Sequence, residues 1–242
     1  MTLEEAIEKA NGGDIGAMES LGSYYMKECE LGNAFRWFLK AADEGSVFGM
    51  VMSANMYNTT AENDRLSGEW EKAYDKFSRA QFYAAKAMPS LEDPTQIFET
   101  LNKAFYGRAF IQKNIFKDYS SALETIKMGD SSILKNRVLE GLCIKLDSKE
   151  NISEAYKLLS ILKDRKVEEL KINEYNEMDQ NTFVEGFTIL ALLLRMFFNQ
   201  IDSAAEVLTK GYNCITCEDG RKMIADELSH YKKGLFGGYK YI

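Results

Sequence analysis

Residues 17–45 read AMESLGSYYMKECELGNAFRWFLKAADEG and contain two patterns separated by a short turn. The first pattern, A-x-x-x-L-G-x-x-Y, places Leu21 and Tyr25 on one face of a helix at four-residue spacing. The second, A-x-x-W-x-x-K-A-A-x-x-G, ends at Gly45, and glycine readily adopts the left-handed conformation that terminates a helix. Small residues, among them Gly22, let two helices approach closely. The stretch therefore predicts a pair of antiparallel helices.

A second copy of this pattern follows 32 residues after the first. Met50 and Tyr57 stand where Met18 and Tyr25 stand in the first copy. Later segments keep an alanine in the first turns of each predicted second helix, at Ala122, Ala155 and Ala205. A repeat of this length corresponds to one helix pair that buries its apolar face against its neighbours.

The motifs of residues 13–58 resemble the Sel-one-like repeats, a branch of the tetratricopeptide superfamily, and beyond residue 58 only the general pattern persists. The resemblance implies an all-α fold, an α-solenoid (superhelix) of about five tetratricopeptide-like antiparallel helix pairs. It also implies an adaptor or scaffold role, with a binding groove lined by the first helix of each pair. Tyr24, which sits beside the inward-facing Tyr25, and Glu28 are the residues that we expect near this groove.

We expect residues 1–242 to form a single helical-repeat domain with polar insertions near 59–68 and 164–181. The tail, residues 231–242, breaks the helical period and is basic and aromatic on an acidic chain. It either caps the last helix pair, since a terminal repeat must cover an apolar face, or serves as a docking peptide or a membrane-surface anchor. The need for end protection favours the cap.

The composition excludes several classes of function. The formal net charge is −7, and no run of Lys or Arg exceeds two residues, so nucleic acid is not an expected partner. The most apolar stretch, residues 187–198, is too short to span a bilayer and predicts a buried helix instead. Four cysteines and no signal-peptide pattern favour the cytoplasm with reduced thiols.

Candidate chemistry is confined to one motif. Cys214 and Cys217, with His230 further on, match the first three ligands of a zinc finger, but no fourth ligand follows. Two small cysteines packed at a helix end explain the pair better. With one histidine, no activated nucleophile and no phosphate-binding loop, the chain is expected to have no catalytic residue, no cofactor, no metal and no enzyme activity.

These observations favour a non-catalytic interaction module that binds a peptide or a partner protein in a concave groove. The first alternative is an immunity or inhibitor protein that masks a toxin or enzyme. The second alternative is an enzyme with an unrecognised site. Because the chain is acidic and lacks a basic cluster, its partner should be basic or amphipathic, and salt should weaken the association.

The missing fourth ligand leads to a prediction about metal content. Protein purified without a chelator should contain well below one equivalent of zinc, because two thiolates and one imidazole leave a structural site incomplete. Elemental analysis measures this content. One equivalent of zinc that is lost in a Cys214→Ser variant would contradict the prediction.

Overall fold

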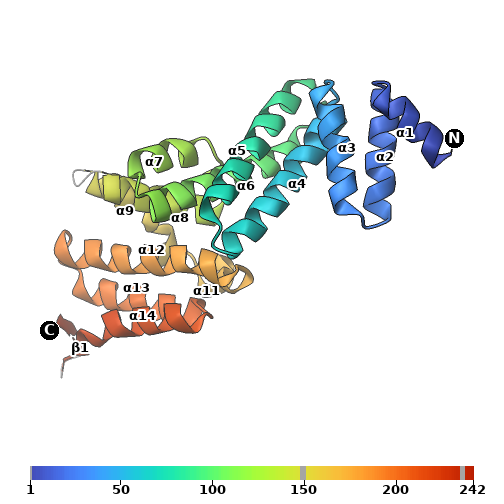
Figure 1. The fold of residues 1–242 in the computed structure, drawn as a ribbon. Coiled ribbons are helices and arrows are strands. Elements are labelled where there is room, and N and C mark those ends of the chain that lie inside the picture. The colour runs from blue at the N-terminus through green and yellow to red at the C-terminus, as the bar shows by residue number, and fades with distance from the viewer. Residues whose placement is uncertain (1, 148–150, 235–237) are drawn as a thin grey trace. The chain divides into compact units, whose positions relative to one another are not determined.

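The computed structural model describes residues 2–147, 151–234 and 238–242, and these form the expected all-α fold of packed helix pairs (Figure 1). The chain divides into two compact units, residues 1–111 and residues 112–242. Each unit buries its own apolar residues between packed helices.

In the first unit, successive helices pack against one another in chain order. The helices are α1 (Leu3–Asn11), α2 (Ile15–Lys27), α3 (Leu31–Asp43), α4 (Val47–Leu66), α5 (Trp70–Ala87), the 3-10 turn η1 (Met88–Ser90) and α6 (Thr95–Ile111). The predicted pairs are therefore α2 with α3 and α4 with α5. Leu21, which the repeat pattern placed on one face of its helix, is almost fully buried, and so are Phe38 of α3 and Phe77 of α5.

Local signals set helix ends of this unit. Thr2 and Glu5 form a complete capping box, in which each side chain accepts a hydrogen bond from the other residue's backbone N–H. Gly45 follows α3 with a φ of +96°, which only glycine adopts without strain.

The polar residues 59–66, which the sequence suggested as part of an insertion, extend α4 by two turns. The hydroxyls of Thr59 and Thr60 donate hydrogen bonds to carbonyl oxygens one turn earlier. Ala61 and Arg65 are both buried and continue the inner face of the helix at four-residue spacing. The added residues therefore lengthen the helix before a turn leads to α5.

Glycine allows helices of this unit to pack backbone against side chain. A Cβ atom on Gly22 of α2 would lie 2.6 Å from Cε1 of Phe38 in α3, closer than carbon atoms can approach. A Cβ atom on Gly107 of α6 would overlap the Phe77 ring of α5 in the same way. The absence of a side chain at these positions therefore sets how closely the paired helices approach.

The second unit contains the remaining elements. These are the π-helical turn η2 (Gln112–Phe116), α7 (Tyr119–Lys127), α8 (Leu134–Asp147), α9 (Ile152–Leu159), α10 (Ile161–Asp164), α11 (Val167–Leu170), η3 (Ile172–Glu174), α12 (Glu177–Met196), α13 (Ile201–Cys214), α14 (Glu218–Ser229) and the strands β1 (Tyr231–Lys233) and β2 (Tyr239–Tyr241). Residues 164–181 form short helical turns and the start of α12, with Leu170 and Ile172 turned into the core.

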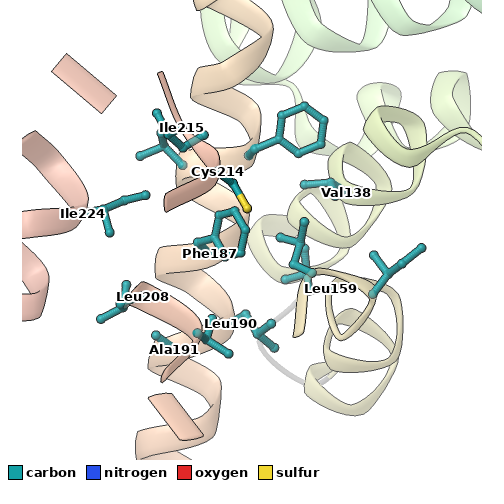
Figure 2. Packing of buried hydrophobic residues seen from close by; sticks show 14 of the residues in the cluster. Val138, Leu159, Phe187, Leu190, Ala191, Leu208, Cys214, Ile215 and Ile224 are labelled. Carbon is teal, nitrogen blue, oxygen red and sulfur yellow. The ribbon is translucent and has the colours of Figure 1, made fainter. Parts of the chain in front are cut away.

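The core of the second unit surrounds Phe187 of α12, which packs among residues of α8, α9, α13 and α14 (Figure 2). This confirms the predicted buried helix for the first part of the stretch 187–198. The last three residues behave differently: Met196, Phe197 and Phe198 are 64%, 51% and 41% exposed. They lie at the end of α12 and in the following turn, beyond the helices that cover its middle.

The C-terminal tail forms an antiparallel hairpin in which Tyr231 of β1 pairs with Tyr241 of β2. The Tyr239 backbone N–H donates to Oδ1 of Asp202 in α13 at 2.5 Å. The Arg195 guanidinium of α12 lies 3.5 Å from the centre of the Tyr241 ring. Tyr239 also packs against the core, whereas Leu235 and Phe236 lie outside the described residues.

The glycine contacts predict opposite effects for two similar substitutions. Gly107→Ala should lower the free energy of unfolding by about 1–3 kcal/mol, because the buried Phe77 ring has no room to move. Gly32→Ala in α3 is the matched control: nothing lies within 4 Å of its Cβ position, so higher helix propensity should leave stability equal or up to about 1 kcal/mol greater. Urea denaturation measures both. Equal effects of the two substitutions would refute the close-approach argument.

Deletion of residues 234–242 tests the role of the tail. The hairpin contacts of Tyr239 and Tyr241 with α12 and α13 are lost in this variant, so the melting temperature should fall by several degrees, as expected when partly buried aromatic side chains lose their packing. Calorimetry measures the shift. An unchanged melting temperature together with lost partner binding would identify the tail as a docking peptide.

Candidate functional site

A surface hollow of about 430 Å³ lies between α2 and α4 in the first unit. These are the first helices of two successive pairs. Its lining is mostly on α2, with one residue from α4: Glu19, Ser20, Ser23, Tyr24, Lys27 and Phe48. The hollow therefore lies on first helices, where the repeat resemblance placed a binding groove.

Tyr24 reaches the hollow because its neighbours on α2 face the core. Leu21 and Gly22 are buried against α3, and Tyr25 packs on the core beside them, so Tyr24, one residue further round the helix, points outward and is 42% exposed. Its ring packs edge-on against Tyr25, with ring centres 5.3 Å apart. This contact gives the exposed ring a defined orientation before any ligand binds.

Phe48 forms the opposite side of the hollow and is 45% exposed. Its ring packs edge-on against the buried Phe38 ring, with centres 5.7 Å apart, so it is also anchored to the core. Sequence reasoning did not single out Phe48. The available signal was its position off the buried stripe of α4, which contains Met50, Ala54 and Tyr57.

One hydrogen bond beside the hollow connects its two helices, and another lies within α2. The Ser46 hydroxyl, which caps the N-terminus of α4, donates to the Glu19 carboxylate of α2. The Ser20 hydroxyl donates to the Gly16 carbonyl oxygen at 2.7 Å. Among the described residues that line the hollow, Glu19 and Lys27 are the charged ones and have opposite charges, and Tyr24 and Phe48 are the aromatic ones.

Glu28 is exposed and caps the C-terminus of α2, and its backbone N–H donates to the Tyr24 carbonyl oxygen at 3.1 Å. It does not line the hollow but follows Lys27 directly at its edge. Of the two residues predicted near a groove, the structure thus places Tyr24 in the hollow and Glu28 at the end of the same helix.

Helix α4 contains no charged residue from Val47 to Ala61, a stretch that begins beside the hollow and continues outside it. Asn55 is exposed there, and its Oδ1 accepts a hydrogen bond from the Thr100 hydroxyl of α6 at 2.6 Å. Nδ2 of the buried Asn58 donates to the Thr100 carbonyl oxygen at 2.7 Å. These asparagines connect the first helices α4 and α6, and Asn55 retains an amide donor for a ligand.

The cysteine motif lies in the second unit, and His230 is far from its two cysteines. Cys214 ends α13 and Cys217 caps the start of α14, whereas His230 caps the other end of α14, about 20 Å away at 1.5 Å per residue. Figure 2 shows Cys214 among apolar side chains, and burial raises the pKa of its thiol. The three side chains cannot share one metal ion, and no group of three or more His, Cys, Asp or Glu residues suited to a metal occurs in the described ranges.

The described part of the chain contains no helix that is both long and apolar enough to cross a membrane. No protein-family model matches the sequence, and no curated protein sequence is significantly similar to it.

The structure is similar to that of YrrB, a TPR protein with an unusual peptide-binding site. The alignment has a TM-score of 0.51, covers 95% of this chain and 98% of the YrrB chain, and contains 13% identical residues. At this identity the similarity concerns the fold. The chain is therefore an all-α protein of tetratricopeptide-like helix pairs.

Proposed function

We propose that the protein is a non-catalytic binding module and that the α2–α4 hollow holds a segment of a partner protein. The observation that carries the proposal is the pair of exposed aromatic rings, Tyr24 and Phe48, each supported by a second ring beneath it. Anchored aromatic side chains lose little conformational freedom on binding and are common energetic centres of interfaces. The binding of peptides by YrrB supports the same kind of function for this fold.

The partner segment that fits best is amphipathic and basic. An apolar side chain of the segment would fill the space between Tyr24 and Phe48, and its backbone would continue outside the hollow along the uncharged stretch of α4 towards Asn55. Residues 1–111 contain 17 acidic and 11 basic residues, which favours the approach of a cationic segment. Glu28 lies where it could contact a basic residue that extends past Lys27.

We place the protein in the cytoplasm and assign it no reaction. All four cysteines are free, and three of them, Cys143, Cys214 and Cys217, are buried as thiols. Burial raises the pKa of Cys143 to about 12, so this thiol is neutral near pH 7 and a poor nucleophile. These features suit a reducing compartment and a protein whose cysteines serve packing.

Peptide binding tests the proposal. A fluorescent basic amphipathic peptide should bind more tightly than its acidic counterpart, and the preference should shrink between about 50 and 200 mM salt as the Debye length falls. Phe48→Ser should weaken binding roughly tenfold, since it removes one aromatic anchor. Fluorescence anisotropy measures both effects.

Phe98→Ser is the matched control, because Phe98 is 49% exposed on α6 but does not line the hollow. Its affinity should equal that of the wild type. If the Phe48→Ser and Phe98→Ser variants bind the peptide equally well, the proposed site is wrong. If Phe48→Ser instead weakens the binding of an acidic peptide, the proposed charge preference is wrong.

A further inference from the structure

A second hollow, of about 500 Å³, lies between α5 and α6 of the first unit. It shares no residue with the α2–α4 hollow. Five of its lining residues come from α5 and one from α6: Ser78, Gln81, Phe82, Ala85, Lys86 and Arg108. Its chemistry differs from that of the first hollow, because both of its charged side chains are basic.

Within the described residues, neither cation of this hollow has an acidic partner. The Arg108 guanidinium donates to the Gln81 side-chain oxygen and to the Tyr74 hydroxyl at 3.2 Å, and both acceptors are neutral. It also lies 5.3 Å from the centre of the Tyr74 ring. Lys86 is exposed and forms no ion pair within the described part of the chain.

This arrangement departs from the rest of α5. The other three basic residues of the helix each have a carboxylate within 3 Å: Lys72 pairs with Glu69, Lys76 with Asp64 and Arg79 with Asp75. The surrounding unit is acidic, with 17 Asp and Glu against 11 Lys and Arg in residues 1–111. The hollow is therefore a small positive site whose charge the protein leaves uncompensated.

An apolar surface adjoins the cations. Phe82 is 59% exposed at the hollow, and its ring packs edge-on against Tyr83 with centres 5.2 Å apart. Tyr83 is in turn held by a hydrogen bond from its hydroxyl to Asp43 at 2.9 Å. The aromatic ring and the guanidinium thus both have fixed orientations, one from ring packing and the other from hydrogen bonds.

We propose that the α5–α6 hollow is a second binding site, which takes an acidic peptide segment. One Asp or Glu carboxylate would lie between Lys86 and Arg108, and a neighbouring apolar side chain would pack on Phe82. The guanidinium is preorganised for a carboxylate, and charge-assisted hydrogen bonds to such groups are the strong ones. A long polyanion such as nucleic acid fits poorly, because it would extend past two cations into the field of an acidic unit.

This site is independent of the proposed function, since it has the opposite charge preference and different residues. Both sites could hold separate parts of one partner or two different partners. The α2–α4 variant Phe48→Ser should therefore leave binding at the α5–α6 hollow unchanged, which distinguishes failure of one proposal from failure of the other.

The test uses the full chain labelled with ¹⁵N and three short blocked peptides that differ at one position, with Glu-Phe, Gln-Phe or Lys-Phe at the centre. The Glu-Phe peptide should shift backbone NMR signals of residues 78–86, whereas the Gln-Phe and Lys-Phe peptides should shift them little. Lys86→Glu should weaken binding of the Glu-Phe peptide at least about fivefold, since it converts an attractive charge into a repulsive one.

Lys103→Glu is the matched control, because Lys103 is exposed on α6, outside the hollow, and the substitution changes the net charge equally. It should preserve the affinity. Phe82→Ser should also weaken binding, which tests the apolar contact without changing charge. Three outcomes overturn the proposal: equal binding of the Gln-Phe peptide, equal weakening by Lys103→Glu, or no shifts at millimolar peptide. Both charge variants lie on the surface, and circular dichroism verifies that they fold.

Discussion

Where Gly107 of α6 meets Phe77 of α5, the backbone of one helix packs directly against the aromatic ring of the other. The same arrangement occurs between Gly22 and Phe38 and, in the second unit, between Gly211 of α13 and Phe187 of α12. Such contacts bury a large ring without a gap and hold paired helices at one separation. The remaining packing depends on that separation, because alanines such as Ala80, fully buried, fill the seam only if the helices stay close.

The close pairing also determines what the surface can offer. Once the inner face of each helix is occupied, three exposed aromatic residues of the first unit rest on buried or half-buried rings. Tyr24 on Tyr25, Phe48 on Phe38 and Phe82 on Tyr83 all follow this pattern. The core thus extends to the surface through ring contacts, and this gives both hollows of the first unit a rigid apolar component at low entropic cost.

Charge in the first unit is organised at a finer scale than its net value suggests. The acidic excess of residues 1–111 favours cationic partners at a distance. Close to the surface, one hollow contains the opposite charges of Glu19 and Lys27, and the other contains Lys86 and Arg108, which form no ion pair within the described residues. At contact distance, individual charges separated by a few ångströms dominate over the screened field of the whole unit. Two segments of opposite charge can therefore bind neighbouring regions of one unit.

Much of the fold could be predicted from local sequence because the signals act over a few residues. The capping box at Thr2, the left-handed Gly45 and the buried alanines of second helices depend only on neighbouring positions. The exposure of Tyr24 was also predictable, since it adjoins an inward-facing residue on a helix. The extension of α4 was not, because its polar residues gave no sign that Ala61 and Arg65 would be buried by other helices.

The two hollows could not be predicted from the sequence for the same reason: each is formed by residues of two different helices. Phe48 lines the first hollow only because α4 packs beside α2, and Lys86 meets Arg108 only because α5 and α6 lie together. The cysteine motif shows the reverse case. Its spacing in the sequence suggested a metal site, but the length of α14 separates Cys217 from His230. Sequence alone determined the helices and their inward faces, which follow from periods of three to four residues. Tertiary structure decided which outward-facing residues meet, because such meetings join positions distant in the chain.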